Sequence, residues 1–354
     1  MPEPKILFLY TEIAGYFLAG IRALLKKNIE VHIVRYPVNN EAPFNFKNTE
    51  NIKFYERNDY TPSQLLNLAK KINPQIIIVS GWRDKAYLKI ASFFKKNTPV
   101  ILTFDNRWEG TLKQYIAVLM SPFFLKTRFS YVWVPGNSQK KYAEKLGFKK
   151  QNIYTGFYSA DTNLFSEYYR KYKTLKENNF PEKFLFTGRY IPAKNIFLLW
   201  EAFAELQKDT PNEWELICTG TGELFDKRIK HPKIKHLGFV QPENIGKIIS
   251  ETGVFILPSK FEPWGVVVHE TATAGFPLIC SDKVGAAEIF LENEKNGFIF
   301  QAGDKEDLKR VLKKIISLSQ EELIKMSKIS REKSQKITSE TWANTIMKFL
   351  NTKK

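Results

Sequence analysis

Short apolar runs alternate with amphipathic stretches along most of this chain. Near the N-terminus, the apolar run 6–10 leads into a glycine-containing turn, a helical pattern and a second apolar run, which predicts a strand, a helix and a strand. Repetition of this unit is typical of a mostly parallel sheet covered by helices. Further strands are expected at 76–79, 100–104 and 131–134, and helices at 61–72, 83–96 and 137–146.

The same alternation restarts in the second half, with an expected strand at 184–187 and a helix at 196–208. The polar, charged segment 166–183 between the halves is interpreted as a linker. The predicted fold class is therefore α/β, with two doubly wound, Rossmann-like domains facing across a cleft, because ligands of such sheets bind outside the carboxyl ends of the strands. The predicted domains are 1–165 and 184–338, and a final helix, 339–350, is expected to pack back on the first domain.

The segment GVFILPSKFEPWGVVVHE, residues 253–270, carries two carboxylates across a predicted strand, loop and helix. Pro263 suits a first helical position, where its missing N–H costs nothing, so Glu262 is expected at the mouth of the helix. At a rise of ~1.5 Å per residue, Glu270 would lie roughly 12 Å further along the axis. Two carboxylates that flank one glycosidic bond are about 5–9.5 Å apart. The wider spacing favours two ends of one elongated ligand.

The predicted helix start between the carboxylates favours an anion. Backbone N–H groups near Trp264, Gly265 and Val266 would face a phosphate, so the segment as a whole predicts a nucleotide-sugar site. The alternative is that Glu262 only caps the helix and Glu270 is solvated on its outer face. The residues that follow, ETATAGFPLICSD, continue the helix to Gly275 and start another strand, which favours the ligand site.

A second group of candidate residues follows the predicted strand at 184–187 in FLFTGRYIPAKN. Gly188, Arg189 and Lys194 would lie at the edge of the sheet where ligands bind. The two cations could stabilise a departing diphosphate without a metal ion, and the sequence has no D-x-D motif to hold one. Alternatively, both are ordinary surface charges. The pair Gly220 and Gly222 is not part of a G-x-G-x-x-G fingerprint, so a nicotinamide cofactor is disfavoured.

Composition narrows the class of protein. With 354 residues, 43% of them hydrophobic, the chain can form two globular cores, and no apolar run reaches the ~18 residues of a membrane helix. The first apolar run is too short for a secretory signal, so a cytoplasmic location is expected. Cys218 and Cys280 fall in predicted core strands, and the cysteines and histidines have no zinc-like spacing. Neither a metal nor a cofactor is predicted.

The formal net charge of +17 favours anionic partners, although part of it could be a compositional bias of the surface. Nucleic acid is disfavoured because no RNP, KH or zinc-finger pattern accompanies the charge. The apolar stretch 115–125 is bracketed by basic residues, which suits an interfacial helix on an anionic membrane such as the inner face of the cell membrane; the alternative is buried core. The bracketing residues are Lys95, Lys96, Arg107, Lys113, Lys126 and Arg128.

The motifs together resemble the retaining family-4 glycosyltransferases of the GT-B fold. The resemblance rests on GRYIPAKN, PSKFEPWGVVVHETATAGFPLICSD and GAAEIFLENEKNGFIF, and on GFYSADTNLF before the predicted linker. It implies that Arg189 and Lys194 bind the donor diphosphate, Glu270 the nucleotide ribose and Glu262 the sugar hydroxyls. It further implies that Val240 presents its backbone to the base and that the loop at Gly15 approaches the phosphates.

Two positions depart from the family pattern. Many members carry a histidine after the third strand of the first domain, where this chain has TFDNRW with Asp105, and Asn195 stands where the family usually has glycine. Asp105 could accept a hydroxyl proton or stabilise positive charge at the anomeric carbon. Other polar and aromatic residues near strand ends are expected on the acceptor side, where the aromatics either stack on sugars or fill core. They are Trp82, Arg83, Asp84, Arg107, Trp108 and Glu109.

The sequence thus predicts a metal-independent, retaining glycosyltransferase that uses a nucleotide diphosphate sugar, with UDP favoured, and a glycan or lipid-linked acceptor of the cell envelope. Two alternatives stay open. A GT-B sugar-nucleotide epimerase would release a modified sugar without an acceptor. A non-catalytic nucleotide-sugar sensor or scaffold would bind the donor without turning it over.

Overall fold

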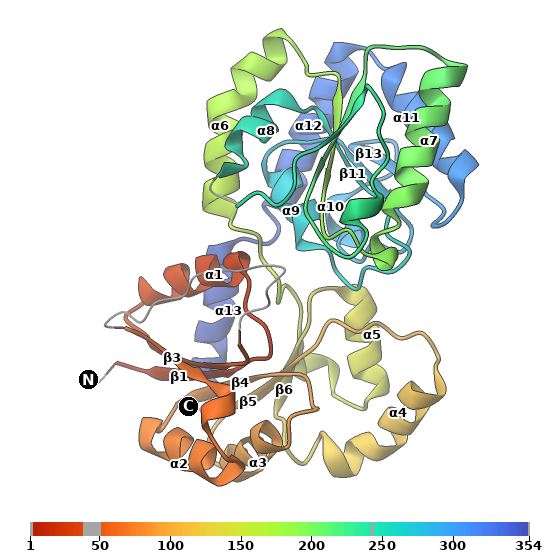
Figure 1. The fold of residues 1–354 in the computed structure, drawn as a ribbon. Coiled ribbons are helices and arrows are strands. Elements are labelled where there is room, and N and C mark those ends of the chain that lie inside the picture. The colour runs from red at the N-terminus through yellow and green to blue at the C-terminus, as the bar shows by residue number, and fades with distance from the viewer. Residues whose placement is uncertain (1–2, 38–50, 242–243, 353–354) are drawn as a thin grey trace. The chain divides into compact units, whose positions relative to one another are not determined.

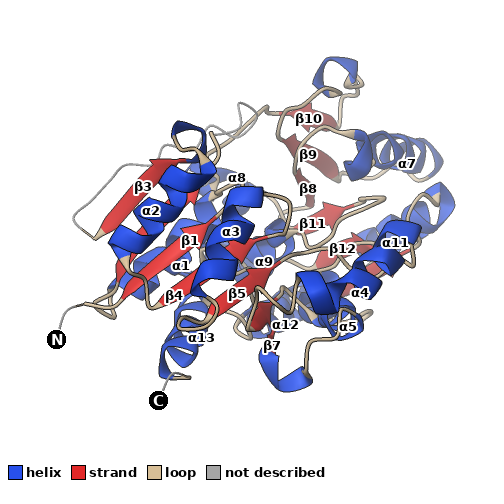
Figure 2. Ribbon diagram, turned by 90° about the horizontal axis from the view of Figure 1, so that it is seen from below, coloured by secondary structure: helices blue, strands red, loops and turns tan. Residues whose placement is uncertain are grey.

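The computed structural model describes residues 3–37, 51–241 and 244–352. The chain forms two compact units, residues 1–159 with 339–354, and residues 160–338. Each unit is a parallel β-sheet with helices on its faces (Figures 1 and 2). The sequence predicts two doubly wound domains, and the two parallel sheets confirm this fold class.

The first unit is built on a seven-stranded sheet in the order β3-β2-β1-β4-β5-β6-β7. All of the described strand pairs in it are parallel. The order reverses direction between β1 and β4, which is where ligands of doubly wound sheets bind. The strands are β1 Lys5–Leu9, β2 Glu30–Arg35, β3 Ile52–Glu56, β4 Ile76–Ser80, β5 Val100–Thr103, β6 Tyr131–Trp133 and β7 Ile153–Tyr154.

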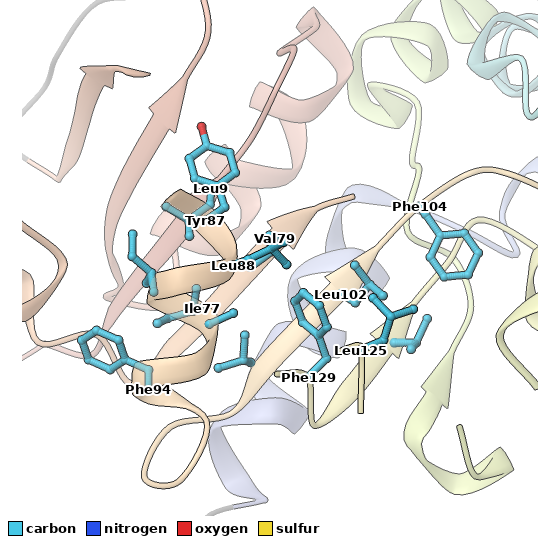
Figure 3. Packing of buried hydrophobic residues seen from close by; sticks show 14 of the residues in the cluster. Leu9, Ile77, Val79, Tyr87, Leu88, Phe94, Leu102, Phe104, Leu125 and Phe129 are labelled. Atoms are coloured by element: carbon cyan, nitrogen blue, oxygen red, sulfur yellow. The ribbon is translucent and has the colours of Figure 1, made fainter. Parts of the chain in front are cut away.

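Helices cover both faces of this sheet, and the alternation of side chains along the strands explains why both faces are apolar. In β1, Ile6 and Phe8 join a core cluster with residues of α1 and α13, whereas Leu7 and Leu9 join a second cluster with residues of α2 and α3. Figure 3 shows part of this second cluster. The helices are α1 Gly15–Leu25, α2 Pro62–Ile72, α3 Lys85–Phe94, α4 Leu112–Phe124, α5 Asn137–Lys145 and α13 Ser339–Asn351.

The second unit is built on a six-stranded parallel sheet in the order β10-β9-β8-β11-β12-β13. Helix α7 packs with α11, and α9 packs with α6 and α12. The strands are β8 Lys183–Thr187, β9 Glu215–Thr219, β10 Ile234–His236, β11 Val254–Leu257, β12 Leu278–Ser281 and β13 Gly297–Phe300. The helices are α6 Thr162–Asn178, α7 Ile196–Asp209, α8 Gly246–Glu251, α9 Val266–Thr273, α10 Ala287–Phe290, α11 Lys305–Ile316 and α12 Gln320–Ser334.

The segment 166–183, which the sequence predicts as a linker, mostly forms helix α6 and belongs to the second unit. Asp161 caps this helix by accepting from the Leu164 N–H at 3.2 Å, and Phe165 and Tyr168 are buried along it. The chain passes between the units at 159/160 and at 338/339 instead. The final helix, α13, packs against α1 in the first unit, where Trp342 donates to the Phe157 carbonyl at 2.8 Å.

Two further expectations concern the cysteines and membrane spans. Cys218 in β9 and Cys280 in β12 are buried and free, as predicted for thiols that act as small hydrophobes. Within the described ranges, no helix has both the length and the apolar character that crossing a bilayer requires. The same ranges contain no cluster of three or more His, Cys, Asp or Glu side chains arranged to hold a metal ion.

Candidate functional site

Three candidate donor residues of the second unit follow neighbouring strands at one edge of its sheet. Arg189 and Lys194 follow β8, and Glu262 follows β11. These two strands are neighbours in the sheet, and the strand order reverses direction between them. A doubly wound sheet opens its ligand crevice at such a switch point, since the loops on either side turn in opposite directions. Residues 68 positions apart in sequence thereby reach contact.

The loop after β11 differs from its prediction. Helix α9 begins at Val266 rather than at Pro263, and Gly265 precedes it in a left-handed conformation with φ of 91°. A residue in that conformation cannot continue a right-handed helix. The carbonyl of Glu262 accepts from the Gly285 N–H at 3.0 Å, and that of Trp264 accepts from the Ala286 N–H at 2.8 Å. These carbonyls are therefore committed to a neighbouring loop instead of a helix.

The later helix start changes the geometry of the two carboxylates. Glu262 lies in the loop, where it forms a parallel bridge with Val284, and only Glu270 lies on α9. The separation of roughly 12 Å along one helix axis therefore does not apply. The N-terminus of α9 is retained as a candidate anion site, because its first turn contains no acidic residue and begins beside Gly265.

Lys194 and Glu262 form an ion pair at the switch point. The Lys194 ammonium donates a hydrogen bond to the Glu262 carboxylate, and both side chains are largely buried. The stem of Lys194 passes Gly188, since an ideal Cβ at Gly188 would lie 3.8 Å from the Lys194 Cε. This arrangement holds a lysine charge beside the first turn of α9, where a phosphate could take it as a partner.

The backbone after β8 is packed tightly against the loop after β9. An ideal Cβ at Gly220 would lie 1.9 Å from the carbonyl oxygen of Gly188, and Gly220 has φ of 121°, so only glycine fits there. The Gly188 N–H donates to the Thr219 carbonyl at 3.1 Å. The side chain of Arg189 is exposed next to this contact. The contact fixes the point from which Arg189 projects.

Asn195 occupies the position where the resembling family has glycine. It adopts a left-handed conformation with φ of 55° and ends the short 3₁₀ turn Pro192–Lys194 before α7. Asparagine enters this region more readily than most residues, so the substitution preserves the backbone path that glycine would give. The turn also receives the Lys260 N–H at the Ala193 carbonyl, at 2.9 Å, which links it to the Glu262 loop.

Glu270 is half-buried on α9, and burial together with the nearby charge of Asp161 raises its pKa to about 7. A carboxylate of this kind is costly to ionise and gains from hydrogen-bond donors that favour its charged form. Two vicinal hydroxyls, such as those of a ribose, are donors of that type. The sequence predicts Glu270 as a ligand contact, and its raised pKa is a feature that candidate functional sites often show.

His269 precedes Glu270 and holds α9 in place. Its Nδ1 accepts from the Ala160 N–H at 3.0 Å, and its Nε2 lies 3.0 Å from the Ser334 carbonyl, which assigns the Nε2–H tautomer. The ring stacks on Phe290 with centroids 4.2 Å apart, and burial lowers its pKa to about 4. His269 thus stays neutral. It links α9 to Ala160, at the start of the unit, and to Ser334, at the end of α12.

Val240 is half-buried in the segment after β10, whose conformation is set partly by Gly238. The Gly220 N–H donates to the Gly238 carbonyl at 2.7 Å, so this segment is joined to the loop after β9. Val240 therefore follows the carboxyl end of the sheet, on the side of β9 and β10. Its suggested contact with a nucleotide base rests on the resemblance alone.

In the first unit, the candidate residues follow β1, β4 and β5 at the carboxyl edge of the sheet. Gly15 is the first residue of α1, Trp82 and Arg83 follow β4, and Asp105 follows β5. The Tyr158 hydroxyl lies 3.4 Å from the Asp105 Oδ2, and the Tyr158 ring packs edge-on against Tyr16, with centroids 5.6 Å apart. Asp105 and the Gly15 loop are thus brought to one place by two tyrosines.

The remaining acceptor-side candidates have local structural roles. Trp82 packs edge-on against Phe104, and Trp108 against Tyr115, at centroid separations of 5.4 and 5.0 Å, so both indoles lie partly in core. The Arg107 Nε lies 3.5 Å from the Glu109 Oε1, which makes them an ion pair. Asp84 caps α3 and pairs with Arg57 at 2.7 Å, and Arg83 beside it is exposed.

Three features of the site have weak signals in the sequence. Gly285 supports the Glu262 loop so closely that a Cβ there would lie 2.1 Å from the Pro263 carbonyl oxygen. Asp161 adds to the effect of burial in raising the pKa of Glu270, and His269 holds the helix that carries Glu270. Gly285 and Asp161 stand in motifs that carry the family resemblance, but their roles depend on contacts between distant segments.

Comparison with known proteins identifies relatives of the second unit. Residues 169–333 match the family model described as glycosyl transferases group 1. An uncharacterized glycosyltransferase of Methanocaldococcus jannaschii is 31% identical over 121 residues, which cover 32% of this chain and 30% of the relative. The O-antigen chain mannosyltransferase B of Escherichia coli is 26% identical over 113 residues, covering 30% of each chain. This chain thus spans less than a third of the length of these two relatives.

A solved structure resembles the whole chain. The Anabaena protein Alr3699/HepE, crystallised in complex with UDP and glucose, aligns with a TM-score of 0.72 over 99% of this chain and 100% of its own, at 16% identity. Similarity at this identity shows the fold alone. The predicted GT-B architecture of two Rossmann-like units is confirmed, and so is the resemblance of the second unit to group 1 glycosyltransferases.

Proposed function

We propose that this chain, whose residues 169–333 match the family model of group 1 glycosyl transferases, moves a sugar from a nucleotide diphosphate sugar to a glycan or lipid-linked acceptor. The observation that carries the proposal is the contact of Lys194 with Glu262 at the switch point of the second sheet. A cation for phosphate and a carboxylate for sugar hydroxyls meet there, beside a helix N-terminus.

The diphosphate is the leaving group in this reaction. The bond between the anomeric carbon and the β-phosphate oxygen breaks while negative charge grows on that oxygen. Lys194 and Arg189 are the groups proposed to stabilise this charge, together with the N-terminus of α9. Two side-chain cations in this role make a divalent metal unnecessary, so we propose metal-independent transfer.

The acceptor oxygen is proposed to attack from the face that the diphosphate leaves. Its proton then passes to the departing phosphate oxygen, and the new glycosidic bond retains the anomeric configuration. Asp105, which stands in the position of the family histidine, is proposed to accept a hydroxyl hydrogen bond or to stabilise positive charge at the anomeric carbon. The acceptor itself is assigned to the first unit.

The two carboxylates are proposed to divide the donor between them. Glu270 would bind the ribose, because hydroxyl donors stabilise the ionised form of a carboxylate whose pKa burial has raised to about 7. Glu262 would bind the sugar while it positions Lys194. UDP is the proposed nucleotide, supported by the UDP and glucose bound to the structurally similar Anabaena protein.

The proposed setting is cell-envelope glycan or glycolipid synthesis at the cytoplasmic side of the membrane. The name of the Escherichia coli relative refers to an O-antigen chain, which supports a glycan product. A panel of UDP, GDP and ADP sugars, assayed for nucleotide release in EDTA together with glycan and lipid-linked acceptors, tests the proposal. Release from one donor by the wild type, with loss in Lys194→Ala, is expected. No release from any donor, or release that needs Mn²⁺ or Mg²⁺, would contradict it.

A further inference from the structure

Helix α4, Leu112–Phe124, exposes a continuous apolar row on the surface of the first unit. Leu112, Leu119 and Phe123 are 76%, 74% and 77% exposed. The spacing places all members of the row on one face of the helix, over its full length. The exposed apolar side chains of α4 are Leu112, Tyr115, Ile116, Leu119, Met120 and Phe123.

The opposite face of α4 packs against the unit. The helix is therefore well anchored, and its apolar row lies at the surface although the helix itself is folded onto the core. Ser121 is buried and donates to the Leu146 carbonyl at 2.6 Å. Ala117, Val118 and Phe124 pack against the core cluster, and Leu125 and Phe129 lie within it beside Leu102 (Figure 3). Thr111 closes a capping box with Gln114 at the start. The alternative that the stretch 115–125 is buried core therefore holds for one face only.

Basic side chains lie at both ends of the exposed row. The helix itself carries one charged residue, Lys113, and no acidic residue. At its C-terminal end, Lys126 is exposed and Arg128 donates to the Phe124 carbonyl at 2.6 Å. Lys95 donates to the Lys126 carbonyl, which brings the end of α3 to the same place. At its N-terminal end, the Lys145 ammonium lies 4.8 Å from the centre of the Trp108 ring.

We propose that this face of α4 docks on an anionic lipid bilayer, with the apolar row inserted among the acyl chains and the flanking cations at the phosphates. The combination of an apolar face with lysine and arginine at its edges is what holds interfacial helices on membranes. The net charge of +17 also attracts the protein to an anionic membrane, over a longer range than the side chains of α4 do.

A second copy of this chain is a poorer partner for the same face. Two such faces in contact would bring Lys113, Lys126 and Arg128 of one copy against the like charges of the other. An anionic bilayer satisfies both features of the face, since it offers a hydrocarbon layer below a layer of negative charge. This inference rests on α4 and its neighbours and is independent of the proposed donor site.

Co-sedimentation with vesicles tests the proposal in the absence of any substrate. Wild-type protein is expected to bind vesicles that contain phosphatidylglycerol at low salt, to bind pure phosphatidylcholine vesicles more weakly, and to lose binding as salt rises. The double variant Leu119→Ser, Phe123→Ser removes the two most exposed side chains of the central and C-terminal turns. It should bind at least tenfold more weakly, because about 0.8 kcal/mol is lost for each CH₂ no longer buried in lipid.

A second set of variants tests the contribution of the basic side chains by replacing Lys113, Lys126 and Arg128 with glutamate. Removal of each cation should weaken binding about fivefold, and reversal should weaken it more. Matched controls on the second unit are Leu175→Ser for exposed apolar area, and Lys313→Glu with Lys325→Glu for charge, since all three side chains are exposed. The controls should bind vesicles like the wild type.

Three outcomes would overturn the proposal. Wild-type protein that ignores anionic vesicles at low salt contradicts it, as does equal loss of binding in the control variants. Concentration-dependent dimerisation of wild-type protein in sedimentation velocity without lipid, abolished by Leu119→Ser, Phe123→Ser, would identify a second copy as the occupant. Nucleotide release from a soluble donor is unaffected by any of these outcomes, so the proposed function stands or falls separately.

Discussion

Lys194 reaches across from the loop after β8 to the carboxylate of Glu262 in the loop after β11. Each partner compensates the charge of the other in a site where both are largely buried. A diphosphate that binds there would share the Lys194 ammonium with Glu262, and the sugar attached to it would lie within reach of the carboxylate. In the proposed reaction, the pair would therefore link recognition of the sugar to stabilisation of the leaving group.

Removal of either cation should slow the reaction. Lys194→Ala and Arg189→Ala are each expected to lower kcat on the order of 10²–10³, because each loses a charge that acts on the developing phosphate anion. Lys208→Ala, an exposed lysine on α7, is the matched control and should retain the wild-type rate. Nucleotide release is the measurement. Wild-type rates in both site variants would show that the phosphates bind elsewhere.

The two carboxylates should have separable effects on binding. Glu270→Ala is expected to weaken the binding of free UDP, because the ribose loses its acceptor. Glu262→Ala should change UDP affinity less than Glu270→Ala does, because Glu262 acts on the diphosphate only through Lys194, and should mainly weaken binding of the sugar nucleotide, because it loses the contact with the sugar. Calorimetric titration of each variant with UDP and with a UDP-sugar measures both effects. An equal loss of UDP affinity in the two variants would contradict the division.

The pKa of Glu270 predicts a pH dependence of binding. Since burial and Asp161 raise this pKa to about 7, and hydroxyl donors bind the ionised form, UDP binding should release a proton and strengthen as pH rises through 7. Below that pH the affinity should fall by up to about tenfold per unit. Titrations between pH 5.5 and 8 measure it. Glu270→Gln removes this component and leaves the titration of the nucleotide itself, so identical pH profiles would refute the assignment.

A buried lysine away from the donor site predicts a stability effect. The Lys176 ammonium lies 3.9 Å from the centre of the Phe276 ring and has no hydrogen-bond partner among the described residues, and burial lowers its pKa to about 7. The unfolded chain, with an ordinary pKa near 10.5, binds more protons between pH 7 and 10.5. Stability should therefore rise with pH across this window.

Lys176→Met should raise the free energy of unfolding at pH 7 on the order of 2 kcal/mol, and the gain should shrink toward pH 10. Lys173→Met, an exposed neighbour on the same helix, serves as the control and should change stability little. Chemical denaturation at pH 7 and at pH 10 gives both values. A destabilised Lys176→Met variant would mean that the lysine charge has a partner in solution.

The sequence predicts the strands at β1, β4, β5, β6 and β8 well, because short apolar runs between turn signals are strong local features. It misassigns α6 as a linker, since the helix is largely polar and its buried residues, such as Phe165 and Tyr168, are visible as one face only against α9 and α12. Helix identity there depends on tertiary packing rather than on composition.

The site also has features that the sequence predicts and features that it does not. Arg189, Lys194 and Glu262 follow strand ends, and Glu270 lies on the helix after β11, so their region of the sheet can be predicted from the sequence. The start of α9 at Val266 cannot, because hydrogen bonds from Gly285 and Ala286, some twenty residues later, compete with the local preference of Pro263 for a first helical turn. Local signals identify the residues, and long-range backbone contacts set their geometry.

Acceptor-dependent turnover distinguishes a glycosyltransferase from an epimerase and from a protein that only binds the donor. Wild-type protein is incubated in EDTA with the UDP-sugar that it binds, with and without a panel of glycan and lipid-linked acceptors, and nucleotide and sugar products are quantified together. A glycosyltransferase should give UDP and a glycosylated acceptor in equal amounts, with only slow release of UDP when no acceptor is present. Conversion of one nucleotide sugar into another without acceptor, or tight donor binding without turnover for every acceptor, would contradict it.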